Sequence, residues 1–410
     1  MRIAYILSRY PTVTETFIRE EMLAMLEDGI DLRVYPLRGP QDTTWVVAGV
    51  PDGGIINHVR RFGFAVSGAN LAAAAAELTR SPARFIAACG LLLRVCPAGI
   101  AGAAKALYLL PKLCRIARDL RGWGPCHVHA HFANLPAAGA AFIGRLVPAS
   151  ASFTSHAFDI YCRDRASLDR LVGAVDFCVT ISQRNRRYHL QKLPSSRHDL
   201  VHVVHCGVDT TNFAPVKVGT GPLVAVGRLV PKKGFDLLVR AMAGLRDMGI
   251  DLPCLIIGDG TQRHELESLV AELDVADRVK FAGARTSAEV REALSDATAF
   301  VLPCIEAPGG DMDGIPVSLM EAMSMQKVVV TSDISGIREL VTDGDNGLLL
   351  PPGDVPALVA LLARLARGEV DVESLGRSAR ATVEADFHSR KNARSLRSLI
   401  SNCTRTEEAR

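Results

Sequence analysis

Short apolar runs alternate with amphipathic helical patterns along almost the whole chain. Parallel strands must be joined by crossovers, which are usually helices, so this alternation predicts parallel sheets with helices on both faces. Twelve runs qualify as strands and divide into two sets of six, which predicts two sheets. The candidates are residues 3–7, 32–36, 127–130, 151–154, 177–180, 201–204, 223–226, 254–257, 279–281, 299–302, 328–331 and 347–350.

Two domains are expected, because 410 residues are too many for one ordinary core. Pro and Gly cluster at residues 213–222, and no apolar periodicity crosses that stretch. We therefore predict an α/β fold with one doubly wound domain at residues 1–212 and another at 213–385. Residues 386–410 hold a further helix that can cross back to the first domain, and a tail that frays. Ligands bind at the carboxyl ends of such strands, so the expected site is the cleft between the domains.

Residues 67–121 interrupt the alternation within the first domain. They are rich in Ala and Leu, follow a helical period and contain no strand candidate. A helical insertion with a solvated basic face is one interpretation. A surface that approaches an anionic lipid or a lipid-linked acceptor is the other. The basic residues are Arg80, Arg84, Arg94, Lys105, Lys112, Arg115, Arg118 and Arg121.

Composition argues against several classes of protein. The net charge is +3, aromatic residues are 5%, and no basic stretch is interleaved with aromatic residues, so no nucleic-acid partner is expected. The ten cysteines are scattered without a Cys-x-x-Cys pair, which argues against zinc or a disulfide framework and fits a reducing compartment.

Neither export nor membrane spanning is predicted. The first apolar run ends at Ser8, which is too short for a signal peptide and better suited to a first strand. The most apolar segment, residues 85–110, is interrupted by two cations and a proline, whereas a span needs about 20 apolar residues. We expect a cytoplasmic protein, with the inner face of the membrane as its location if the basic surface binds lipid.

Three histidines alternate in His127-Val128-His129-Ala130-His131, which puts their imidazoles on one face of a predicted strand. The neighbouring sequence offers no Cys or carboxylate to complete a tetrahedral set. We therefore predict no metal site, and expect packed or cleft-lining histidines.

The first motif that indicates chemistry comprises Gly227-Arg228-Leu229 and Lys233-Gly234, between a strand candidate and a predicted helix at 235–245. A glycine at a strand end allows a ligand to approach the backbone, and a helix N-terminus favours anions. Arg228 can fork across two oxygens while Lys233 adds a point charge, which suits a diphosphate. A loop with solvated cations is the alternative.

The second motif is Gly258-Asp259-Gly260-Thr261, which also lies between a strand candidate and a helical pattern. Gly258 and Gly260 make half of a dinucleotide-binding fingerprint, and the third glycine is missing. The alternative is a tight turn in which Asp259 or Thr261 caps the next helix.

The third motif is a Gly- and acid-rich loop at residues 303–316, which leads into a helix that can begin at Pro316. Asp313 on the loop, with the backbone amides of Gly314 and Ile315, can bind sugar hydroxyls. Glu321, farther along on the helix, can bind a ribose diol. The alternative is a helix-capping acid and a surface acid.

Together these segments resemble the donor domain of the retaining glycosyltransferases of family 4, which have the GT-B fold. The family's Gly-Arg-Leu-x-x-x-Lys-Gly, Gly-x-Gly, Glu-x7-Glu and Ala-Met motifs match in order at 227–234, 258–260, 313–321 and 322–323. Residues 205–213 and 343–354 are also similar, and the loop at 309–316 resembles a subgroup that builds exopolysaccharides of the colanic-acid type. One position departs from the pattern, because Asp313 stands where the family has Glu. The contact with the donor sugar could then weaken, or pass to the Gly314 amide.

The resemblance implies two Rossmann-like domains that face a cleft. The implied activity is transfer of a hexose-type sugar from a nucleoside diphosphate sugar to a polysaccharide or lipid-linked acceptor, with retention. No cofactor is implied beyond the sugar nucleotide as co-substrate, and no metal is required because two cations stabilise the leaving diphosphate. The implied catalytic residues are His156, Asp313, Arg228 and Lys233. The implied donor-binding residues are Gly227, Arg228, Lys233, Gly258, Gly260, Asp313, Gly314, Ile315 and Glu321.

The first domain offers fewer signals. Thr12 and Glu15 have the spacing of a capping box, which favours helix capping, and contact with the donor diphosphate is the alternative. His156 follows a strand candidate, and its alternative role is a structural histidine bonded to Asp159.

Two other functions fit the same fold. An epimerase would use the donor groove without an acceptor, and a non-catalytic two-domain protein would only bind sugar. A dehydrogenase is disfavoured, because the full Gly-x-Gly-x-x-Gly after the first strand is missing.

Overall fold

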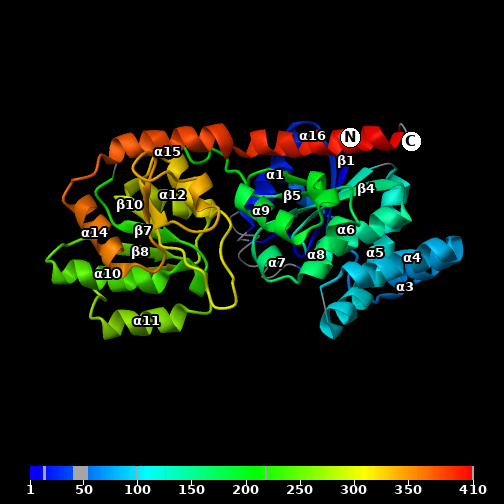
Figure 1. Ribbon diagram of the computed structural model, residues 1–410, viewed down its shortest axis with the longest axis horizontal. Helices are drawn as coiled ribbons and strands as arrows, with labels where there is room; N and C mark the ends of the chain where they lie inside the picture. Colours follow the sequence, from blue (N-terminus) through cyan, green and yellow to red (C-terminus); the bar gives the residue numbers. More distant parts are fainter. Residues whose placement is uncertain (13–14, 40–53, 98, 125, 218, 409–410) are drawn as a thin grey trace. The chain divides into compact units, whose positions relative to one another are not determined.

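The computed structural model describes residues 1–12, 15–39, 54–97, 99–124, 126–217 and 219–408 (Figure 1). Val13 and Thr14 of the first turn, and Val218 of the predicted linker, lie outside the described residues. The chain divides into two compact units, one formed by Met1–His205 with Arg390–Arg410 and the other by Cys206–Ser389. The predicted boundaries were 212 and 385, whereas the units divide after His205 and after Ser389, and Val208 is already buried in the core of the second unit.

The first unit contains a six-stranded sheet in the order β2-β1-β3-β4-β5-β6, and all neighbouring strands are parallel. The chain begins in the middle of the sheet, moves out to β2 and returns to β3 on the other side of β1. The strand order therefore reverses between β1 and β3, which is where such sheets bind ligands. The strands are β1 (Arg2–Leu7), β2 (Asp31–Pro36), β3 (Cys126–His131), β4 (Ala149–Ser155), β5 (Phe177–Thr180) and β6 (Val201–Val203).

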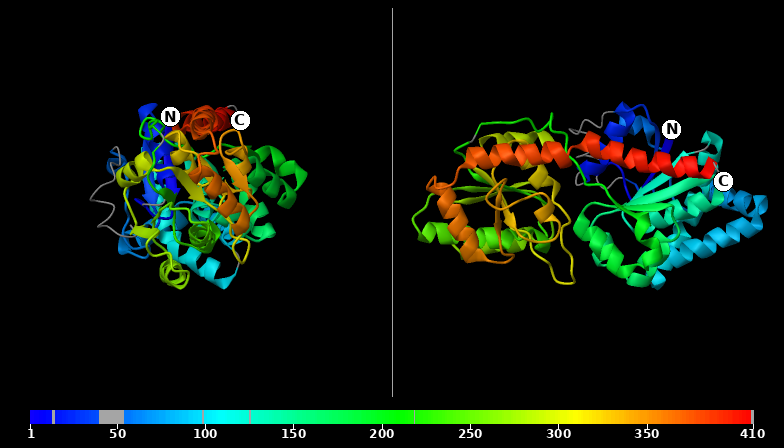
Figure 2. Two further views of the ribbon diagram at one scale, coloured as in Figure 1. Left: turned by 90° about the vertical axis from the view of Figure 1, so that its left-hand side faces the viewer. Right: turned by 45° about the horizontal axis from the view of Figure 1, so that its top comes forward.

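Residues 67–121 form helices, as predicted, and contain no strand among the described residues. Figures 1 and 2 show these helices, α3 (Gly68–Arg80), α4 (Pro82–Val95) and α5 (Ile100–Trp123), together at one side of the first sheet. Pro82 occupies the first turn of α4, where its missing N–H costs nothing. The other helices of this unit are α1 (Thr16–Glu27), α6 (Leu135–Leu146), α7 (Phe158–Tyr161), α8 (Arg165–Val172), α9 (Gln183–Lys192) and α16 (Ser389–Glu408), with 3-10 turns at Ile55–His58 and Ser195–Leu200.

The second unit repeats the plan with a parallel sheet in the order β12-β11-β10-β7-β8-β9, so the strand order reverses between β7 and β10. The strands are β7 (Leu223–Val226), β8 (Cys254–Ile257), β9 (Val279–Gly283), β10 (Ala299–Leu302), β11 (Val329–Ser332) and β12 (Leu348–Leu350). The helices are α10 (Phe235–Asp247), α11 (Arg263–Glu272), α12 (Ser287–Asp296), α13 (Val317–Ser324), α14 (Val355–Ala366) and α15 (Val372–Asp386), with 3-10 turns at Pro231–Lys233 and Ile337–Glu339.

The last helix, α16, packs on the first unit. Leu396 and Ile400 are fully buried in a cluster with Met22 of α1. Asp28, just after α1, accepts hydrogen bonds from Arg397 at 2.9 Å and from Arg394 at 3.2 Å. The sequence predicted a helix followed by a fraying tail within residues 386–410, but the helix continues to Glu408.

The predicted fold class is confirmed, and each of the twelve strand candidates forms a strand within a residue or two of its expected bounds. Buried parallel strands are continuously apolar, which is why short runs marked them.

Candidate functional site

The predicted donor-binding motifs converge at the carboxyl edge of the second sheet, where β7 and β10 are neighbours. The loop after β7 carries Gly227 and Arg228, and the loop after β10 carries Asp313. The Ser318 hydroxyl of α13 donates to the Val226 carbonyl at 3.0 Å and ties the start of α13 to the end of β7. This edge is the topological switch point of the sheet, the usual place for a ligand in such folds.

Three glycines allow the loops after β7 and β8 to pack closely. A Cβ on Gly258 would lie 1.9 Å from the Gly227 carbonyl oxygen, and a Cβ on Gly260 would lie 2.4 Å from the Leu229 carbonyl oxygen. A Cβ on Gly227 would lie 3.3 Å from Cε of Lys233, so this glycine leaves room for the lysine stem. Whatever their part in donor binding, all three positions have a packing reason to be glycine.

The capping proposed in the alternative interpretation of the second motif is wrong. Helix α11 begins at Arg263 with Gln262 as its N-cap and has no side-chain cap. Asp259 instead accepts the N–H of Gly260 at 2.7 Å, within the turn itself.

A buried cluster of opposite charges links the first and third motifs. Nζ of Lys233 lies 2.5 Å from one carboxylate oxygen of Asp313, and Nζ of Lys232 lies 3.3 Å from the other. Lys232 also donates to Asp311 at 3.0 Å. The two lysines are at most 9% exposed, so their charges need these partners in the absence of a ligand.

Electrostatics fix the protonation states of this cluster. Burial alone would raise the pKa of Asp313, but Lys233 and Lys232 outweigh burial and hold the pKa below its ordinary value. Burial would lower the pKa of Lys233, but Asp313 outweighs it and raises the pKa. Arg228 opposes that rise, so its guanidinium is near enough to act on Lys233. At neutral pH Asp313 is therefore a carboxylate and Lys233 a charged ammonium.

Hydrogen-bond donors without acceptors surround this cluster. Arg228 is exposed, and its guanidinium has no partner among the described residues. The N–H groups of Gly314 and Ile315 also find no acceptor in the described part of the chain, although both residues are buried. Buried amides are normally paired, so these two are available to a ligand.

The third motif places its acids as the sequence predicted. Helix α13 begins directly after Pro316 and has no side-chain cap, and Glu321 lies in its second turn, half-buried. Asp313 pairs with lysines and neither caps the helix nor lies free on the surface. The alternative of a capping acid and a surface acid is therefore wrong.

His156 follows β4 in the first unit and is buried. Its backbone N–H donates to Asp159 at 3.0 Å, while Nε2 of its ring lies 3.2 Å from Nδ1 of His131. Nε2 of His131 lies 3.2 Å from Glu21, which also accepts from the Tyr5 hydroxyl at 2.7 Å. The contact with Asp159 thus exists through the backbone, and the ring has a different partner. Burial, aided by His131, holds the pKa of His156 well below its ordinary value, so the ring is neutral.

The histidines of β3 are packed inside the first unit, as predicted. His127 contacts Ser150 at 2.7 Å and Ser152 at 2.6 Å, and His129 contacts Ser152 at 2.7 Å and Thr154 at 3.0 Å. Burial lowers the pKa of His127 to about 3 and that of His129 well below its ordinary value. These rings are therefore neutral members of a hydrogen-bonded ladder between β3 and β4.

One group could suggest a metal. Donor atoms of Glu21, His129 and His131 lie within 4.8 Å of one another. The sequence pattern did not predict that a carboxylate of α1 reaches β3. However, Ser152 and Thr154 occupy both ring nitrogens of His129. A hydrogen-bonded network fits these residues better than a metal site.

The capping prediction for the first turn is wrong. Helix α1 has Glu15 as its N-cap without a side-chain cap. The Thr12 hydroxyl donates to the Glu15 carboxylate at 3.1 Å instead of to the helix backbone.

Sequence reasoning missed Lys232, Asp311 and Glu21. Lys232 stands beside Lys233 in the same motif, and Asp311 lies two residues before Asp313. Their proximity was a usable signal for the charge cluster. Glu21 had no such signal, because it is 110 positions from His131 in the sequence.

Comparisons with known proteins found a family match within the second unit and similar solved structures for nearly the whole chain. Residues 214–382, which lie within the second unit, match the family described as glycosyl transferases group 1. The amylovoran biosynthesis glycosyltransferase AmsK of Erwinia amylovora is 39% identical over 43% of this chain and 44% of its own length. WcaL of Escherichia coli, named for colanic acid biosynthesis, is 37% identical over 52% of this chain and 53% of its own. The chain thus spans about half the length of the curated relatives it matches.

Solved structures extend the similarity to the whole fold. The structure of Anabaena HepE in complex with UDP-glucose covers 98% of this chain and 100% of its own, with a TM-score of 0.72 and 16% identity. The chain has the GT-B fold.

Proposed function

We propose that this chain is a glycosyltransferase that moves a hexose-type sugar from a nucleoside diphosphate sugar to a saccharide or lipid-linked saccharide. The observation that carries the proposal is the unpartnered Arg228 beside Lys233, at the switch point of a group 1 domain. The names of the relatives in amylovoran and colanic acid biosynthesis support an exopolysaccharide pathway.

The donor diphosphate is proposed to bind Arg228 and Lys233. The exposed guanidinium can fork across two oxygens, and the ammonium can add a point charge. When the diphosphate leaves, negative charge grows on the bridging oxygen, and both cations stabilise it without a proton transfer. Because these cations supply the stabilisation, we propose that transfer needs no divalent metal.

Asp313 is proposed to exchange partners during binding. In the structure its carboxylate neutralises Lys233, so an arriving diphosphate competes with it for the ammonium. Once displaced, Asp313 can turn to the sugar together with the amides of Gly314 and Ile315. Its shorter side chain, compared with Glu, suits this dual use.

The remaining assignments rest on position and resemblance. Glu321, half-buried in α13, is proposed to bind the ribose diol. Gly227, Gly258 and Gly260 allow the backbone to approach the donor. His156 is proposed to act on the sugar side of the reaction, and retention at the anomeric carbon is proposed from the resemblance alone.

The acceptor side is proposed to lie on the first unit. Among the described residues, no helix combines the length and apolarity that crossing a bilayer requires. The basic helices α3–α5 are proposed to contact the inner face of the membrane peripherally, where a lipid-linked acceptor would be presented.

A donor screen tests the proposed function. The purified chain is incubated with nucleoside diphosphate sugars of different base and sugar, with and without acceptor lipid extract, and nucleotide release is measured. Release that increases with acceptor supports transfer. Conversion of the donor sugar without acceptor would indicate an epimerase, and binding without any turnover would indicate a non-catalytic protein.

A further inference from the structure

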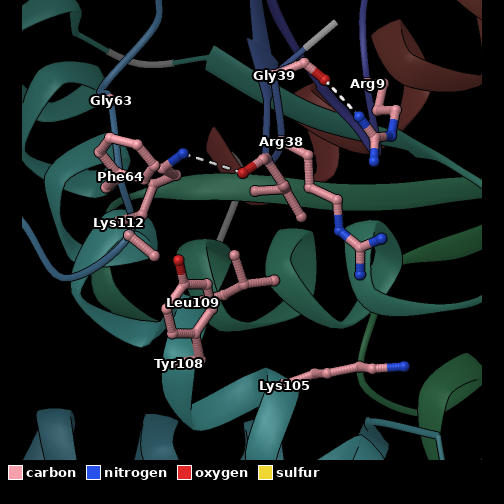
Figure 3. Close-up of a pocket in the computed structure, with 11 residues that line it drawn as sticks. Arg9, Arg38, Gly39, Gly63, Phe64, Lys105, Tyr108, Leu109 and Lys112 are labelled. Carbon is pink, nitrogen blue, oxygen red and sulfur yellow. Dashed lines mark hydrogen bonds between the residues drawn. The ribbon is translucent and has the colours of Figure 1, made fainter. Parts of the chain in front are cut away.

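A hollow lies at the carboxyl ends of β1 and β2 in the first unit. It has a volume of about 440 Å³. Arg9 follows β1 and Arg38 follows β2, while Lys105, Tyr108 and Lys112 reach it from α5 (Figure 3). Carboxyl ends of parallel strands are the usual ligand-binding edge, so the position itself favours a binding site.

The hollow is strongly cationic. Arg9, Arg38, Lys105 and Lys112 line it, and none of the lining residues that the structure describes is acidic. Arg9 donates to the Gly39 carbonyl at 2.9 Å, and Lys112 donates to the Leu37 carbonyl at 3.0 Å (Figure 3). A guanidinium has five N–H donors and an ammonium three, so each keeps further donors for a ligand.

The other two cations have no counter-charge. Arg38 and Lys105 are exposed, and their side chains make no hydrogen bond or ion pair with any residue that the structure describes. Figure 3 shows the charged ends of Arg9, Arg38 and Lys105 extending toward the same side of the hollow. Four cations without a carboxylate repel one another, and a bound anion would remove that repulsion.

The rim of the hollow is apolar. Phe64 is 82% exposed and Tyr108 is 50% exposed, and both line it. Ten of the thirteen exposed large apolar side chains of the described chain lie between Ile56 and Tyr108. Scattered exposed apolar residues are ordinary, but such a concentration marks an interaction surface.

The surrounding charge has one sign. Residues 60–118 contain nine Lys or Arg and one acid, Glu77. Glu77 is buried and pairs with Arg121 at 2.6 Å, so it does not offset the exposed cations. A ligand that satisfies this region needs an anionic group and an apolar portion. A free phosphate would leave Phe64 and Tyr108 uncovered.

We propose that this hollow binds the phosphoryl group of an amphipathic phosphate or diphosphate, whose apolar portion runs over Phe64 and Tyr108. One part of this proposal rests on the proposed function, namely that the natural ligand is the phospholipid-type carrier of the acceptor saccharide. The binding of an amphipathic phosphate itself does not depend on it. Arg9, Arg38, Lys105 and Lys112 would surround the phosphoryl oxygens, as charge-assisted donors do in phosphate sites.

Vesicle flotation of the full chain tests the proposal, without any donor. Phosphatidylcholine vesicles are compared with vesicles that also contain phosphatidic acid, whose headgroup is a phosphomonoester. We expect binding only to the second kind, and we expect Arg38→Ala/Lys105→Ala to weaken it about tenfold or more. The matched control is Arg80→Ala/Arg84→Ala, which removes the same charge from exposed positions of α3 and α4 outside the hollow.

The outcomes separate the sources of binding. A much larger loss in the hollow pair than in the control pair supports a site. Equal losses would mean general attraction to an anionic surface and would overturn the proposal. Short-chain phosphatidic acid and inorganic phosphate, each titrated calorimetrically, test the apolar portion. Tighter binding of the lipid supports the proposal, and equal binding contradicts it. Thermal unfolding checks that both variants fold.

Failure here is distinguishable from failure of the proposed function. Donor binding and donor hydrolysis without acceptor do not involve the hollow, so they test the proposed function separately. Flotation reports on the hollow whether or not any sugar is transferred.

Discussion

Replacing Asp313 by Asn should destabilise the second unit. The change keeps the shape of the side chain but removes the charge that pairs with Lys233 at 2.5 Å and Lys232 at 3.3 Å. At an effective dielectric constant of about 20, each contact corresponds to roughly 5–7 kcal/mol of Coulomb attraction before desolvation. Removing one partner of a buried pair costs about 3–5 kcal/mol. Because Lys232 keeps its ion pair with Asp311, we expect Asp313→Asn to lower the unfolding free energy by about 3 kcal/mol, the low end of this range.

The pH dependence of this loss has a defined sign. The pKa of Asp313 is depressed in the folded chain, so its contribution is present above the ordinary pKa of 3.8 and is lost as pH falls through the folded value. The difference in unfolding free energy between wild type and the Asn variant should therefore be constant near neutral pH. It should shrink only below pH 3.8.

Scanning calorimetry is the suitable assay, because both tryptophans of the sequence lie in the first half of the chain and fluorescence would not report on the second unit. Asp311→Asn is the matched control. Among the described residues the Asp311 side chain pairs with Lys232 alone, and it is 30% exposed, so removing its charge should lower the unfolding free energy by about 1 kcal/mol or less. Equal stabilities of the two Asn variants would refute the account of the charge cluster.

Three further predictions follow from the site. Lys233→Ala should lower turnover by about a hundredfold or more, because the leaving diphosphate loses a cation. Steady-state kinetics measure the loss, and circular dichroism checks that the variant folds. Unchanged turnover would remove the diphosphate role of Lys233. Glu321→Gln should weaken nucleotide binding, measured by calorimetry, whereas unchanged affinity would remove the ribose assignment. Gly258→Ala should cost more than about 2 kcal/mol in denaturant unfolding, because its Cβ would lie 1.9 Å from the Gly227 carbonyl oxygen. Gly249→Ala, which has open space around it, should cost about 1 kcal/mol for its positive φ and serves as the control.

The fold could be predicted because its signals are local. Each strand is a short apolar run, and each crossover helix has its own period, so neither depends on distant residues. The strand at 328–331 shifted by one residue to Val329–Ser332, which is the usual uncertainty of element ends.

The donor motifs could be found for a similar reason. Gly227, Arg228 and Lys233 are close in sequence, and Asp313 precedes its helix at a fixed spacing. What the spacing could not show is that Asp313 pairs with Lys233, because that contact joins two loops that only the sheet brings together. The sequence assigned these two residues separate partners in the donor, whereas in the structure they are partners of each other.

The first unit shows more clearly which features could not be predicted from the sequence. The cationic hollow combines Arg9, Arg38, Lys105 and Lys112, which come from three separate segments. The sequence showed that residues 67–121 were basic, but not that two of these cations face Arg9 and Arg38. Glu21 and His131 illustrate the same point, since only the packing of α1 on β3 joins them.

The central claim is that Arg228 and Lys233 hold the diphosphate of a sugar nucleotide. Calorimetric titration of wild type and Arg228→Ala/Lys233→Ala with the nucleoside diphosphate and monophosphate of the accepted donor tests it most directly. We expect wild type to prefer the diphosphate by about tenfold or more, and the double variant to lose that preference while still binding the nucleoside. An equal preference for the diphosphate in both proteins would contradict the claim.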